Sequence, residues 1–142
     1  MSMFRPNFQT FLLSAALLAP LSALAADDKA LDNERADIAR QVQIMDGRYP
    51  AKGITTAEAA DAAIDQSLQL QNRLEIWANG AERHCYQVFF VNDCIKNVKV
   101  ERRSYLPTLQ RISIEAKALQ RQLRVMERDK ELAQKQAQSS PD

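Results

Sequence analysis

The sequence predicts an all-α protein built on a disulfide-stapled antiparallel helical hairpin, or coiled coil, with three helices after removal of a signal peptide. Three observations lead to this prediction. The glycines are only Gly47, Gly53 and Gly80, and the rest of the chain is rich in the helix formers Ala, Gln, Leu, Glu and Arg. The two cysteines lie close together in the middle of the chain. A long heptad pattern follows them.

The first 25 residues have the pattern of an export signal. Arg5 is the only charge before Asp27, and a mainly apolar stretch of 14 residues leads to the small-x-small site Ala23-Leu24-Ala25. We therefore expect a signal peptide over residues 1–25, cleaved before Ala26. The apolar stretch is shorter than the about 20 residues that a membrane span needs, and an uncleaved anchor is the alternative. The signal resembles bacterial ones, so the expected location is the periplasm.

The first helix is predicted near residues 29–46. Its apolar residues recur at spacings of seven, four and three, at Leu31, Ile38, Val42 and Met45. This spacing is typical of one helical face. The segment from Gly47 to Gly53 contains Pro50 and is expected to be a hinge or loop.

The second helix is predicted near residues 56–90. Thr55, Thr56 and Glu58 form a capping-box pattern, in which a hydroxyl and a carboxylate satisfy each other's backbone donors. An apolar stripe follows at Ala60, Ala63, Leu70, Leu74, Trp77, Ala81 and Val88. Asn79-Gly80 could break the helix, but the stripe stays in phase across both residues. They are expected to be a weak point inside it.

The third helix is predicted near residues 94–135 and has the clearest pattern. With Ile95 at position a and Val98 at position d, ten of twelve a and d positions through Ala133 are apolar. This period favours coiled-coil packing. Pro107 falls at an outward f position, so we expect a kink and not a stop. The domain is expected to cover residues 26–133, with a frayed polar tail at 134–142.

The spacing of Cys85 and Cys94 predicts a reversal of the chain. On one continuous helix their Cα atoms would lie about 13 Å apart, whereas a disulfide needs about 4.4–6.8 Å. In an oxidising compartment such a pair usually forms a bridge, so the turn is expected at residues 91–93, with Asn92 or Asp93 as the cap. A redox-active or metal-binding pair is the alternative. The long spacing and the single histidine, His84, disfavour it.

Pairing about this tip brings Leu74 opposite Tyr105 and Leu70 opposite Leu109, so the two seams match. The third helix then extends beyond the start of the second. We expect the first helix to fold back onto that exposed stretch and to complete a three-helix assembly. An extended two-helix hairpin is the alternative.

The tip segment carries a resemblance to a known group. Residues 85–94 read C-Y-Q-V-F-F-V-N-D-C, and Glu101-Arg102-Arg103 with a long helix rich in Arg and Gln follows. This region, from Glu82 to Glu131, resembles small uncharacterised exported proteobacterial proteins with a C-Y-x-x-F-F-V-N-x-C segment. The resemblance implies export and no particular activity.

Charge is uneven along a nearly neutral chain of 19 basic and 18 acidic residues. Residues 27–93 hold seven basic and twelve acidic side chains, whereas residues 96–130 hold ten and four. Acidic first helices facing a basic third helix would be self-complementary. The alternative is a basic surface for anionic lipid, lipopolysaccharide or an acidic partner, formed by Arg103, Arg111, Arg121, Arg124 and Arg128. The compartment and the lack of stacking aromatics on this helix disfavour nucleic acid.

Phe89 and Phe90 are the candidate interaction residues. Adjacent residues of a helix point about 100° apart, so both rings cannot face one two-helix seam. Either the first helix or a loop covers the second ring, or it is exposed as a binding point at the tip.

No catalytic set, nucleotide-binding loop or metal-ligand spacing is present in the sequence. We therefore expect no enzyme activity, no cofactor and no metal. The expected function is that of a noncatalytic periplasmic interaction or scaffold protein, with a protein partner or self-association through the coiled coil. The alternative is an envelope-surface binder acting through the basic third helix.

Export gives the first testable prediction. Intact-mass measurement of the exported protein should give a chain that begins at Ala26, because the small-x-small site ends at Ala25. A mass that retains residues 1–25 would contradict the prediction of a cleaved periplasmic protein.

Overall fold

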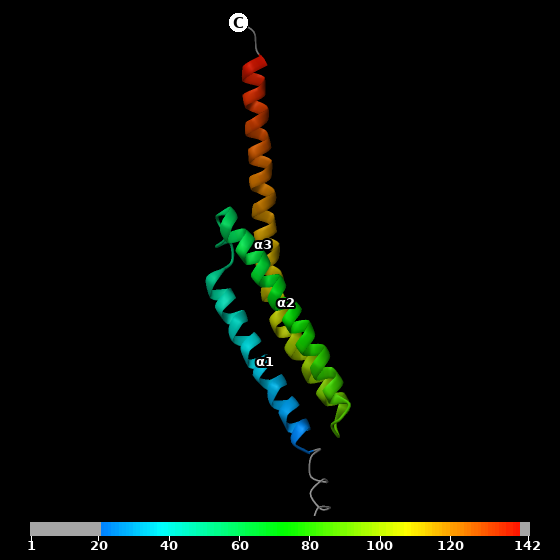
Figure 1. The fold of residues 1–142 in the computed structure, drawn as a ribbon. Coiled ribbons are helices and arrows are strands. Elements are labelled where there is room, and N and C mark those ends of the chain that lie inside the picture. The colour runs from blue at the N-terminus through cyan, green and yellow to red at the C-terminus, as the bar shows by residue number, and fades with distance from the viewer. Residues whose placement is uncertain (1–20, 140–142) are drawn as a thin grey trace, which may run out of the picture.

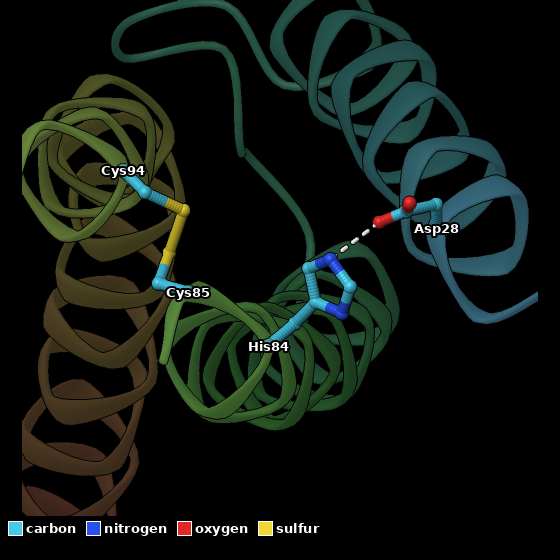
Figure 2. Close-up of a disulfide and its surroundings, with 4 residues drawn as sticks. All are labelled: Asp28, His84, Cys85 and Cys94. Carbon is cyan, nitrogen blue, oxygen red and sulfur yellow. Dashed lines mark ion pairs between the residues drawn. A yellow bond between two sulfur atoms is a disulfide. The ribbon is translucent and has the colours of Figure 1, made fainter. Parts of the chain in front are cut away.

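The structure, a computed structural model, describes the chain from Leu21 to Ser139 and its side chains from Asp28 onward. Within that range it contains three helices, α1 (Leu21–Arg48), α2 (Ala57–Cys85) and α3 (Val91–Ser139). α2 and α3 form an antiparallel hairpin, and α1 lies along it (Figure 1). A disulfide joins Cys85 to Cys94 at one end of the hairpin (Figure 2). The predicted all-α fold is therefore confirmed in its three-helix form.

The helix boundaries differ from the predicted ones. α1 begins at Leu21, so cleavage before Ala26 would remove its first residues, and the predicted signal peptide up to residue 20 lies outside the described residues. α2 ends at Cys85, earlier than predicted. α3 continues to Ser139, so the polar tail is helical at least to that residue. α2 passes through Gly80 and α3 passes through Pro107 without stopping, as expected.

The N-cap of α2 lies one residue later than the predicted capping box requires. Thr56 is the N-cap, and its hydroxyl accepts a hydrogen bond from the backbone N–H of Ala59 at 3.2 Å. Glu58 lies in the first turn but one residue short of the position from which a capping box closes. The helix start was therefore predicted correctly, whereas the reciprocal role of Glu58 was wrong.

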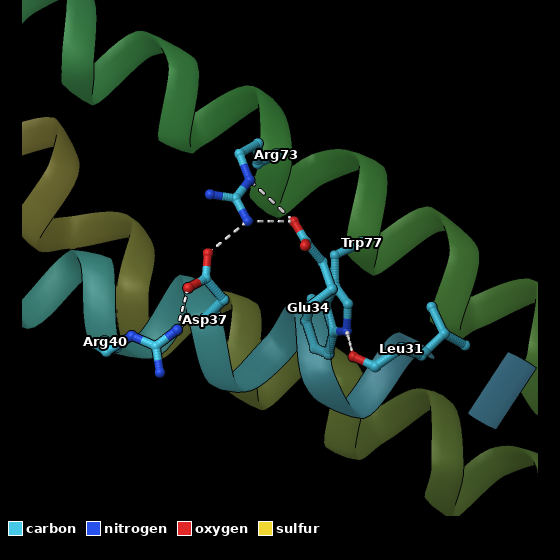
Figure 3. A network of polar contacts seen from close by, with 6 residues as sticks. All are labelled: Leu31, Glu34, Asp37, Arg40, Arg73 and Trp77. Carbon is cyan, nitrogen blue, oxygen red and sulfur yellow. Dashed lines mark hydrogen bonds and ion pairs between the residues drawn. The ribbon is translucent and has the colours of Figure 1, made fainter. Parts of the chain in front are cut away.

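The core lies where the three apolar stripes meet. Leu74 of α2 and Leu109 and Ile112 of α3 are completely buried, as the matching seams predict. Ile38, Val42 and Met45 of α1 are buried against the same cluster. Trp77 is also buried, and its indole Nε1–H donates to the carbonyl of Leu31 at 3.1 Å (Figure 3). Trp77 thus anchors α1 to α2 as a core residue.

α1 does not fold onto the exposed stretch of α3, so that prediction was wrong. The connection between α1 and α2 is a tight turn, in which the Gly53 N–H donates to the Pro50 carbonyl at 2.8 Å. Because this short loop reverses the chain directly, α1 runs back along α2, away from the free end of α3 (Figure 1). A Cβ at Gly53 would lie 2.7 Å from Pro50 Cγ, so the turn needs glycine there.

Ion pairs fix α1 against both other helices. Arg73 of α2 lies 2.8 Å from both Glu34 and Asp37 of α1 (Figure 3). The hydrogen bond from Arg73 lowers the pKa of Asp37, which favours the charged carboxylate. Arg111 of α3 reaches Asp46 of α1 at 2.9 Å. The uneven charge along the chain is thus used in part for internal pairing.

The buried seam gives the second testable prediction. Leu109→Asp places a carboxylate at a completely buried position and should cost about 4 kcal/mol of unfolding free energy, from the lost packing and the buried charge. Arg121→Asp, at an exposed f position of the same helix, is the matched control and should change little. Thermal unfolding followed by circular dichroism measures both. Equal melting temperatures would show that the seam lies elsewhere.

Candidate interaction site

The disulfide closes the hairpin over a very short turn. Cys85 is the last residue of α2 and Cys94 lies in the first turn of α3, with 5.5 Å between their Cα atoms. The chain reverses over residues 86–90, earlier than the predicted 91–93. The first α3 hydrogen bond runs from the Cys94 N–H to the Phe90 carbonyl at 3.0 Å. Asn92 and Asp93 therefore lie inside the helix, and their predicted capping role was wrong.

The turn presents three aromatic side chains to solvent. Phe89 is 91% exposed, Tyr86 71% and Phe90 68%. The two phenylalanine rings contact each other edge to face, with centroids 4.9 Å apart. We call Tyr86, Phe89 and Phe90 the aromatic tip. Of the two alternatives considered for Phe89 and Phe90, the structure shows that both rings are exposed. Both residues lie in the turn, whereas the sequence predicted them on the second helix.

A groove of about 460 Å³ lies beside the aromatic tip, where the N-terminal half of α1 and the beginning of α3 meet the end of α2. We call it the tip groove. Its apolar lining comes from all three helices and includes Leu31, Trp77, Ala81 and Val98. Val88, Phe89 and Phe90 of the turn also line it. Ligand-binding clefts have volumes of about 300–1,000 Å³, so the tip groove can hold several apolar side chains.

Charged side chains also line the tip groove. Its carboxylates are those of Asp28, Asp32, Asp93 and Glu101, and its basic groups are Arg35 and His84. His84 Nε2 lies 2.5 Å from Asp28 Oδ1 and ties the N-terminal half of α1 to the end of α2 (Figure 2). Arg35 donates to Glu101 at 2.9 Å, and this bond raises the Arg35 pKa further. With four carboxylates against one permanently charged guanidinium, the tip groove is negative overall.

The structure separates the five basic residues that were considered as one surface. Arg111 pairs with Asp46 and Glu115 and donates to the Tyr49 carbonyl, so it holds the fold together. The remaining four, Arg103, Arg121, Arg124 and Arg128, are exposed and form no ion pair within the described residues. Three of these lie on the free C-terminal part of α3, far along the helix from Arg103.

Sequence reasoning missed Tyr86 and the His84–Asp28 pair. Tyr86 could have been found, because residues 86–91 form an uncharged run between the charged positions Arg83 and Asp93. The pair of His84 and Asp28 depends on how α1 docks. No local pattern encodes that contact.

Within the described residues no three potential ligands from His, Cys, Asp and Glu gather closely enough to hold a metal ion. In the same part of the chain no helix combines the length and apolar content that crossing a membrane requires. Comparisons with models of protein families, with curated proteins and with solved structures found no match. The function is therefore inferred from the geometry of the chain itself.

The staple gives the third testable prediction. Reduction of Cys85–Cys94 should lower the free energy of unfolding by about 2.7 kcal/mol, the chain-entropy value for a loop of about ten residues. Most of the helicity should remain, because the α2–α3 seam lies outside the loop. Thermal unfolding with and without reductant, with a thiol assay before reduction, measures this. Free thiols or a disulfide-linked dimer in periplasmic material would contradict the intramolecular staple.

Proposed function

We propose that this protein is a noncatalytic interaction or scaffold protein of the periplasm, which binds a protein partner through the aromatic tip and the tip groove. The observation that carries this proposal is the exposure of Phe89 and Phe90 at the stapled end of a rod-like molecule. Large aromatic side chains exposed together on a folded protein are typical of interaction sites. The predicted signal peptide over residues 1–25 and the resemblance at residues 85–94 support the proposed periplasmic location.

The energetics of the tip favour binding. Burying a Phe side chain is worth about 1.5–3 kcal/mol, so two rings can supply a large share of a moderate affinity. The Cys85–Cys94 bridge holds the five-residue turn in place before a partner arrives, which reduces the entropy lost on binding. The negative lining of the tip groove favours a partner segment with apolar side chains next to Lys or Arg.

Crosslinking in the native periplasm tests this proposal and is the fourth prediction. A photoreactive residue in place of Tyr86 should capture a partner, and the double variant Phe89→Ser and Phe90→Ser should lose that capture. Melting temperature should stay unchanged, since both rings are exposed. The matched control is Ile76→Ser, which removes an apolar side chain that is 63% exposed on α2. Equal capture by the tip variant and the control would refute the role of the tip.

The second candidate is an envelope-surface binder that acts through α3. It is favoured by one observation, that Arg121, Arg124 and Arg128 are exposed on a part of α3 with no neighbouring helix (Figure 1). Flotation with vesicles containing phosphatidylglycerol separates the two candidates. Binding that falls as ionic strength rises above about 0.15 M, and that is lost when all three arginines become Gln, would favour this second function.

A further inference from the structure

We propose that the free C-terminal part of α3 pairs with the same segment of a second copy, in an antiparallel two-helix coiled coil. This segment, residues 121–139, is called the α3 overhang. Its proximal limit is marked by Gln120, which donates to Asp61 in the first turns of α2. Within residues 121–139 Leu123 is half-buried, and all the other side chains are exposed. Figure 1 shows this part of α3 standing alone.

The apolar seam of α3 continues past its partner. Leu109, Ile112 and Ala116 occupy heptad positions a and d and are completely buried against the rest of the hairpin. The same frame continues without a slip at Leu119, Leu123, Met126, Lys130, Ala133 and Ala137. Met126, which has no helix to pack on in the monomer, is 58% exposed. Most helical stability in proteins comes from the packing of an apolar face, so a helical partner on this seam would stabilise the α3 overhang.

The order of side-chain sizes along the seam selects a second copy in antiparallel orientation. The large residues come first, at Leu119, Leu123 and Met126, and the Ala residues come last. Antiparallel pairing places Leu123 opposite Ala133 and Met126 opposite Lys130 of the second copy. At the edge of the overhang, Leu119, which is already partly buried against the hairpin core, lies opposite Ala137. Each layer then combines one large and one small or slender side chain, which packs closely. Parallel pairing would instead set Lys130 against Lys130.

Two further constraints select this register. A shift of one heptad toward the hairpins would place Ala133 against Ala116 of the other copy, which is already completely buried within that copy. A shift of one heptad in the other direction would place Leu123 opposite the polar Ser140 of the second copy. In the remaining register Lys130 lies beside Glu127 of the second copy. The two Lys130 charges then reduce the repulsion between the two Glu127 carboxylates, which lie near the symmetry axis. A single polar residue at an a position commonly fixes register in this way.

The resulting dimer has a clear consequence for binding. The two hairpins extend in opposite directions from a central coiled coil, so the two aromatic tips lie at opposite ends of one long rod. One dimer could then bind two sites of a multivalent partner or surface at once, one with each aromatic tip. Its avidity would exceed the affinity of a single tip. The dimer itself does not depend on the function of the tip.

Cysteine crosslinking of the exported protein tests the orientation and is the fifth prediction. Leu123→Cys and Ala133→Cys variants, mixed in equal amounts under mild oxidation, should form a disulfide-linked heterodimer. Each variant alone should crosslink far less, because the two substituted positions face each other only between different variants. Arg121→Cys, at an outward f position, is the control. Efficient crosslinking of Leu123→Cys with itself would overturn the antiparallel arrangement.

Sedimentation equilibrium tests the dimer independently. The wild-type protein should show a concentration-dependent dimer, and Leu123→Asp should raise its dissociation constant by about 100-fold through a charge in the seam. The melting temperature of the hairpin should change little, since Leu123 is only half-buried and lies outside the core cluster. The Phe89→Ser and Phe90→Ser variant should remain dimeric. A wild-type protein that stays monomeric, or a dimer lost through the tip variant alone, would overturn the proposal.

Discussion

The Cys85–Cys94 disulfide constrains the whole molecule, because it holds the end of α2 and the beginning of α3 with their Cα atoms 5.5 Å apart. This closure leaves only residues 86–90 for the reversal of the chain. It thereby sets which residues of α2 and α3 face each other along the seam. It also excludes Phe89 and Phe90 from both helices. The register of the hairpin and the exposure of the aromatic tip therefore have the same cause.

The position of α1 follows from two weaker kinds of contact acting together. Its apolar face packs on the hairpin, and Trp77 donates to the Leu31 carbonyl. Ion pairs from Arg73, Arg111 and Arg35 then fix the orientation of α1 at several points along its length. Each pair is partly exposed and is worth little alone, but together they specify one orientation. α1 in this place forms one wall of the tip groove.

Both ends of the molecule carry apolar surface that the monomer does not cover. At the stapled end this surface is the aromatic tip, held by a covalent bond in a fixed conformation. At the other end it is the seam of α3, which continues beyond α2 because α3 is much longer than its partner. We propose that one end binds a different protein and that the other end pairs with a second copy. The two proposals concern separate surfaces and can be tested separately.

The sequence by itself determined the all-α class, the stapled hairpin and the heptad seam, because each depends on local periodicity and on a short covalent distance. It also identified Phe89 and Phe90 as candidate interaction residues, but not their exposure. The tertiary structure alone decided where the turn falls, where α1 packs and that Arg111 is consumed by internal pairs. These features depend on contacts such as Arg111–Asp46 and His84–Asp28 between residues far apart in the chain. The tight turn at Pro50–Gly53 and the packing of α1 bring these residues together. No local sequence pattern specifies such contacts.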